Sequence, residues 1–194
     1  MTSRKEAIRA LHASGCSKEV IQHCLTVERI ALQLAKRILS RGHELDLTLV
    51  RIGALLHDIG RSRTHGITHG VEGGKILRRL GLGKWASFAE DHIGAGIPKN
   101  EAVRLGLPAR NFMPRTLEEK IVTYADKLAE GNKKVSYRRA LESLKSDLGE
   151  RHPAVRRFKR LHVEIRKLSN GGPAEIRTRD LHLSSRPRCK GGVC

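Results

Sequence analysis

Apolar residues recur every three or four positions through most of the first 170 residues, which is the spacing of amphipathic helices. This pattern predicts successive helices over residues 2–13, 17–42, 46–60, 68–80, 84–94, 116–131, 133–148 and 153–168. No segment shows strand alternation, a hairpin signal or an internal repeat. We therefore expect one all-α domain over residues 1–170.

Residues with capping chemistry mark several of the predicted boundaries. Ser17 and Asp46 each precede a helix and are good N-cap residues. Thr116, followed three residues later by Glu119, forms a capping box at the start of another helix. Gly60 is expected to stop the helix that comes before it.

The helix over residues 46–60 is apolar on all sides, which is typical of a helix in the middle of a domain. It nevertheless ends in His57 and Asp58. Other ionisable residues share an apolar stripe of their own helix, as His23 does with Val27. The ionisable residues that we expect to point inward are His23, His57, Asp58, His69, His92 and Asp126.

A buried carboxylate or imidazole is costly unless it is paired or bound to a metal. A single such histidine is most often a core residue hydrogen-bonded to a carbonyl, but six residues converging from five helices favour a metal site. Mixed His and Asp ligands suit the divalent transition metals Fe, Mn, Co, Ni and Zn, and the sequence does not choose among them. The two oxygens of Asp58 would allow it to bridge two ions.

The order of these residues resembles the HD superfamily of metal-dependent phosphohydrolases, and the segment "HDIG" is the form that names one of its subgroups. The segments HGVEGGKIL, EDHIGAGI and KIVTYADKL resemble later motifs of that subgroup, in the same order, so the resemblance covers about residues 17–130. It implies a single HD-domain helical bundle with additional C-terminal helices. The general pattern is similar to small stand-alone archaeal and bacterial HDIG proteins. The Gly-Tyr-Pro signature of the cyclic-di-GMP phosphodiesterase branch is missing after His92, which disfavours that substrate.

The resemblance also implies which residues hold the metals. One ion would be ligated by His23, His57, Asp58 and Asp126, and a second ion, bridged by Asp58, would be held by His69 and His92. Two divalent ions are therefore the expected cofactors.

We expect a hydrolase in which metal-activated hydroxide cleaves a phosphate ester or anhydride in a nucleotide. Asp58 would take part in catalysis as the bridging ligand, and Arg61 and Lys127 are expected to contact phosphate oxygens. His65 lies outside the matched motifs and is expected to be a loop histidine. Three prolines between residues 94 and 115 predict a loop with one helical turn, which we expect to shape the substrate pocket.

The net positive charge of the chain is compatible with a second function. A formal charge of +18 is either a solvated basic face or a field that attracts a nucleotide or RNA. The alternative function is therefore an HD module that binds RNA or a signalling nucleotide without hydrolysing it. Aromatic residues make up only 3% of the chain, which argues against base stacking on single-stranded RNA. A helical protein with a purely stabilising metal is a third hypothesis.

Further predictions concern the four cysteines, membrane segments and the last residues of the chain. Cys16 and Cys24 are expected to be small buried residues, whereas Cys189 and Cys194 give only a weak zinc signal. The sequence has no secretory segment and no apolar run near the ~20 residues that span a bilayer, so we expect a cytoplasmic protein that does not contact the membrane. Residues 171–194 are expected to be disordered, and a translation or gene-annotation artefact is a second interpretation of this tail.

Overall fold

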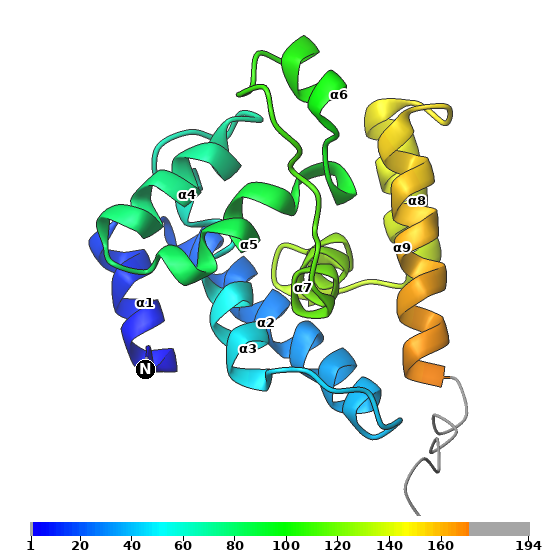
Figure 1. The fold of residues 1–194 in the computed structure, drawn as a ribbon, viewed down its shortest axis with the longest axis horizontal. Helices are drawn as coiled ribbons and strands as arrows, with labels where there is room; N and C mark the ends of the chain where they lie inside the picture. Colours follow the sequence, from blue (N-terminus) through cyan, green and yellow to red (C-terminus); the bar gives the residue numbers. More distant parts are fainter. Residues whose placement is uncertain (1, 171–194) are drawn as a thin grey trace, which may run out of the picture.

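The computed structural model describes residues 2–170, which form a helical bundle (Figure 1). Within this part of the chain the helices are α1 (Arg4–Ala13), α2 (Lys18–Leu39), α3 (Leu47–Leu56), α4 (His69–Arg79), α5 (Ala86–Asp91), α6 (Lys99–Arg104), α7 (Leu117–Lys127), α8 (Tyr137–Leu148) and α9 (Pro153–Asn170). The all-α prediction is confirmed. The predicted extent of the domain and the predictions for residues 171–194, including Cys189 and Cys194, reach outside the described residues.

The middle of the bundle is formed by α2, α3 and α7, which contact one another (Figure 1). Helix α3 has buried residues all round it, as its apolar sequence predicted. Helices α4 and α5 pack together at one end, and α8 and α9 form a helical hairpin along one side. The core is mainly aliphatic, with Ile30, Leu55 and Ile121 among its fully buried side chains, and it also contains Phe158.

The predicted caps are present. The Ser17 side chain accepts a hydrogen bond from the Val20 amide at the start of α2. The Asp46 carboxylate accepts from two amides at the start of α3, and Thr116 and Glu119 form the reciprocal capping box of α7. These boundaries follow from local chemistry, because each cap satisfies amides that the helix itself leaves without a partner.

The end of α3 differs from the prediction. The α-helix ends at Leu56, His57 is its C-cap, and residues Ile59–Ser62 form a short 3-10 helix. Gly60 lies inside this 3-10 helix and is therefore not a helix-ending glycine in the left-handed conformation. Its lack of a side chain serves a close approach instead: a Cβ there would lie 1.9 Å from the carbonyl oxygen of His69.

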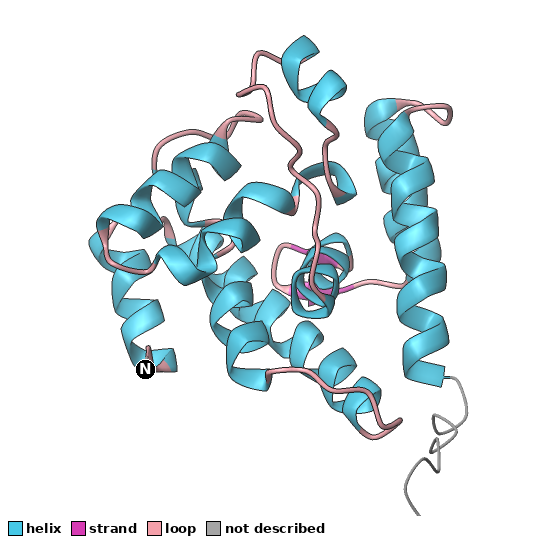
Figure 2. Ribbon diagram, in the orientation of Figure 1, coloured by secondary structure: helices cyan, strands magenta, loops and turns pink. Residues whose placement is uncertain are grey.

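A short β-hairpin follows α7, where the sequence indicated none (magenta in Figure 2). Its strands are β1 (Ala129–Glu130) and β2 (Lys133–Lys134), which pair antiparallel. Two residues per strand are too few to produce an alternating pattern, so the prediction of a helix from residue 133 was wrong. Helix α8 begins instead at Tyr137, with Ser136 as its N-cap.

The segment over residues 94–115 contains α6 and an isolated bridge between Ile97 and Phe112. These two residues, with Ala102 and Leu107, form a small apolar cluster separate from the main core. The one helical turn predicted within this loop therefore corresponds to α6.

Cys16 and Cys24 are both buried and free, as expected. Burial raises the pKa of the Cys16 thiol to about 11, which keeps it protonated and unreactive at neutral pH.

None of the helices described is both long and apolar enough to cross a membrane.

Candidate metal centre

The six ionisable residues singled out in the sequence meet at one place, and most of them lie at helix ends. The positions are His23 within α2, His57 and Asp58 directly after α3, His69 at the start of α4, His92 directly after α5, and Asp126 one residue before the end of α7. Five of them are buried, and the His23 side chain is 18% exposed. Close approach of five helices therefore creates the cluster.

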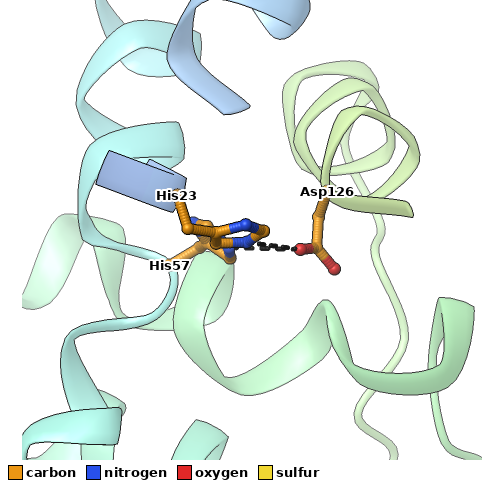
Figure 3. A group of neighbouring side chains, drawn as sticks. All are labelled: His23, His57 and Asp126. Carbon is orange, nitrogen blue, oxygen red and sulfur yellow. Dashed lines mark hydrogen bonds and ion pairs between the residues drawn. The ribbon is translucent and has the colours of Figure 1, made fainter. Parts of the chain in front are cut away.

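One half of the cluster consists of His23, His57 and Asp126 (Figure 3). Both imidazoles point toward the Asp126 carboxylate: its Oδ1 lies 3.0 Å from His23 Nε2 and 3.4 Å from His57 Nε2. The three ligand atoms lie within 4.8 Å of one another. This spacing allows the three atoms to bind a single ion.

The other half consists of His69 and His92, which face Asp58. The Asp58 Oδ1 atom lies 3.3 Å from His69 Nε2 and 3.4 Å from His92 Nε2. The Asp58 Oδ2 atom lies 3.7 Å from His23 Nε2 and 3.8 Å from His57 Nε2. Asp58 thus presents one oxygen to each pair of imidazoles, which is the arrangement that a bridging carboxylate needs.

Backbone carbonyls orient three of the four imidazoles. The Nδ1 atom of His57 donates to Ala54 O at 2.8 Å, that of His69 to Gly66 O at 2.8 Å, and that of His92 to Ala89 O at 2.9 Å. A carbonyl only accepts, so Nδ1 carries the proton in each ring. In its neutral form each ring then directs the lone pair of Nε2 into the cluster, as a metal ligand must.

Several of these polar atoms are poorly satisfied by the protein alone. Within residues 2–170, His57 Nε2 and Asp58 Oδ1 are buried and have no hydrogen-bond partner. The Nε2 atoms of His69 and His92 face each other at 3.2 Å, although both rings donate from Nδ1. Facing lone pairs and buried polar atoms without a partner are costly, and a cation between such atoms removes that cost. The donor set therefore fits bound metal.

The charges inside the cluster also suit a metal. Burial raises the pKa of Asp58, but the neighbouring imidazoles outweigh it and hold this pKa well below the usual range. Burial likewise opposes the ionisation of Asp126, yet Lys127 and two histidines hold its pKa well below the usual range. Burial lowers the pKa of His92 to about 4, so this imidazole is neutral at neutral pH. Burial also lowers the pKa of His57, but the charges of Asp58 and Asp126 raise it well above its ordinary value, so binding a metal would displace a proton.

A cavity of about 320 Å³ opens beside the cluster. Arg61 and Lys127, the two predicted phosphate contacts, both line it and are ion-paired to the clustered carboxylates Asp58 and Asp126. Arg61 Nε lies 2.7 Å from Asp58 Oδ2, and Lys127 Nζ lies 2.6 Å from Asp126 Oδ2. The structure therefore brings these cations to the mouth of the site.

A second part of the cavity lining was missed by the sequence analysis. It comes from one face of α8, through Ala140, Ser143, Leu144 and Asp147. None of the residues that line this cavity belongs to the segment 94–115, so the loop that was expected to shape the substrate pocket does not contribute to this cavity. The helical spacing of the α8 residues was visible in the sequence, but nothing in it showed that this face turns toward the histidines.

His65 is exposed and lies at the edge of a second, smaller cavity, about 220 Å³, which reaches the cluster beside His23, Asp58 and Arg61. His65 lies in the loop between the 3-10 helix and α4, as predicted, and its exclusion from the ligand set stays a prediction.

The part of the chain that contains this centre matches a known protein family. Residues 20–131, which contain all six clustered residues, match the HD domain family. The chain belongs to the HD domain family. The matched region runs from the third residue of α2 to the turn after β1, while α1, β2, α8 and α9 lie outside it.

Three proteins with known names are similar to this HD domain protein in sequence. An uncharacterized protein of Methanocaldococcus jannaschii is 52% identical over 79% of this chain and 91% of its own length. Two proteins named tRNA (cytidine(56)-2'-O)-methyltransferase are also similar: that of Thermoplasma volcanium is 42% identical over 76% of this chain, and that of Picrophilus torridus is 33% identical over 91%. The matched region makes up only 44% and 50% of these two relatives. No solved structure was found to match the chain.

Proposed function

We propose that this HD domain is a metal-dependent phosphohydrolase that cleaves a phosphate ester or anhydride, with a nucleotide as its substrate. The observation that carries the proposal is the position of Asp58, which presents one oxygen to each of two pairs of imidazoles. Two ions held in this way would polarise the phosphoryl group and lower the pKa of water. The imidazole and carboxylate donors suit Fe, Mn, Co, Ni or Zn.

In this reaction the histidines would bind the metals, and Arg61 and Lys127 would contact the phosphoryl group. His57, His69 and His92 are fixed by backbone carbonyls, so their Nε2 atoms are already oriented before substrate arrives. Arg61 and Lys127 reach the cavity with side chains that are 33% and 23% exposed. Their N–H groups would donate to phosphoryl oxygens and compensate charge that develops there during cleavage.

The direct test is metal content together with turnover. Protein purified without oxygen is expected to contain about two divalent ions per chain by elemental analysis, because the cluster offers one bridging and several terminal ligands. The same protein should hydrolyse members of a panel of nucleotides and bis(p-nitrophenyl) phosphate. Chelator-treated protein is the control, and readdition of Mn, Fe, Co or Ni should restore turnover. A metal-loaded protein without activity on the whole panel would contradict the proposal.

A second candidate is a module that binds RNA without hydrolysing it. Two relatives carry the name of a tRNA methyltransferase, and the chain has a formal charge of +18. Helix α9 contributes to that charge through exposed basic side chains, namely Arg156, Lys159, Arg160, Arg166 and Lys167. Such a row of cations binds phosphate groups with an affinity that falls as salt rises.

The RNA hypothesis predicts that replacing Lys159 and Arg160 with glutamine weakens binding of a tRNA transcript. The slope of log affinity against log salt should become shallower with each phosphate contact that is lost, because fewer counterions are released on binding. Exchange of Lys5 and Arg9 on α1 for glutamine is the matched control, because it removes the same charge from another exposed helix. Equal effects of both double variants, or no salt-dependent binding by the parent protein, would reject α9 as an RNA surface.

A further inference from the structure

We propose that Ser143 and Asp147 on α8 bind the ribose hydroxyl groups of the substrate, so that the pocket selects a phosphorylated ribonucleoside. The inference rests on the proposed function, since it concerns the cavity beside the metal centre. It assigns the substrate class and a specificity-determining wall to that cavity.

The charged residues that line the cavity are not evenly distributed around it. Arg61 and Lys127 lie on the side of the histidines and supply positive charge. Ser143 and Asp147 lie on α8, one helical turn apart, and both are exposed to the cavity. The cations of the lining thus lie beside the histidines, and its carboxylates outside the histidine cluster are Asp147 on α8 and Glu130 on β1, which is paired with Arg139.

This division orients a phosphorylated ligand. A phosphate would be attracted by Arg61 and Lys127, and by metal ions if the cluster holds them, and it would be repelled by the carboxylate of Asp147. A carboxylate accepts hydrogen bonds, so the wall of α8 favours a group rich in donors. The neighbouring 2′- and 3′-hydroxyl groups of a ribose offer two such donors, which the two oxygens of Asp147 can accept, while the Ser143 hydroxyl can donate or accept.

The remaining lining suits a sugar and base of limited size. Ile93, Ala140 and Leu144 contribute apolar surface to the same cavity. A volume of about 320 Å³ is at the low end of the roughly 300–1,000 Å³ typical of ligand pockets. One nucleotide unit therefore fits this cavity better than a longer stretch of chain does.

The wall of α8 is held in place by its neighbours. Helix α8 packs against α9, and the exposed Arg139 side chain also pairs with β1, its Nε lying 2.8 Å from Glu130 Oε2. Ser136 caps the helix, and Ala140 is buried. Ser143 and Asp147 are therefore presented on a supported helix, which favours a defined geometry for the hydroxyl groups.

The test compares adenosine 5′-monophosphate with its 2′-deoxy analogue on metal-loaded protein. Affinity is measured as KM if the nucleotide is hydrolysed and as Kd by calorimetry if it is not, so failure of hydrolysis does not prevent the test. We expect the ribonucleotide to bind about tenfold more tightly, because a hydrogen bond to a charged group is lost in the deoxy compound. Asp147→Ala should abolish this preference, and Ser143→Ala should reduce it.

Glu142→Ala is the matched control, since Glu142 lies on the same helix but pairs with Lys145 and is not among the residues that line the cavity. It should keep the tenfold preference. A second pair of probes, a 5′-phosphorylated oligoribonucleotide and its deoxy counterpart, separates the sources of the ribose: a preference seen only in this pair assigns the pocket to the end of an RNA chain. No preference in either pair, or a preference that survives in Asp147→Ala, overturns the inference.

Discussion

Replacing Asp58 with asparagine is expected to lower the bound metal from about two ions to fewer than one per chain and to reduce turnover at least about 100-fold. Loss of a residue that only supports a ligand already costs 10–100-fold in metal affinity or activity, and Asp58 contacts both halves of the cluster directly. Asparagine keeps the volume of the side chain but removes its negative charge. Elemental analysis and turnover of the same preparation check both expectations, and circular dichroism should show unchanged helical content.

His65→Ala is the control for this experiment. His65 lies near Asp58 and Arg61 at the edge of a cavity, but it is exposed and outside the proposed ligand set. The variant should retain about two ions per chain. Full activity in Asp58→Asn would overturn the proposed mechanism, and loss of metal in His65→Ala would show that the ligand set is incomplete.

Replacing Gly60 with alanine is expected to destabilise the fold by about 3 kcal/mol, which lowers Tm by roughly 10 °C in a chain of this size. The added Cβ would lie 1.9 Å from the carbonyl oxygen of His69 and 2.5 Å from the amide nitrogen of Gly73. Both neighbours are backbone atoms, so α4 would have to move away from the 3-10 helix. Because His69 begins α4, metal binding should weaken as well.

Thermal unfolding of the metal-free protein measures the stability effect separately from any change in metal affinity. Gly66→Ala is the matched control, because the nearest atom to a Cβ at this position is Thr64 Oγ1 at 3.5 Å, an ordinary contact. Its Tm should differ little from that of the parent, since substitutions without such clashes are usually within about 0.5 kcal/mol. A Gly60→Ala protein with an unchanged Tm would show that the close approach of α4 is not required.

The helices and their starts could be predicted because they depend on neighbours in the sequence. Apolar periodicity located α2 and α3, and local caps at Ser17 and Asp46 marked where they begin. The same signals missed the β-hairpin after α7, which pairs only two residues per strand. The end of α3 was also misplaced, because Gly60 is required by the approach of α4 and not by the helix that precedes it.

The sequence by itself therefore determined the helical class, the main caps and the identity of the inward-pointing residues, since each of these follows from local spacing and from the cost of burying a charge. Only the tertiary structure decided how those residues meet. The two oxygens of Asp58 are divided between two pairs of imidazoles because α2, α3, α4 and α5 converge there. Likewise, α8 forms the cavity wall because its hairpin with α9 turns Ser143 and Asp147 toward the site. Such contacts join residues far apart in the chain, and no local pattern encodes them.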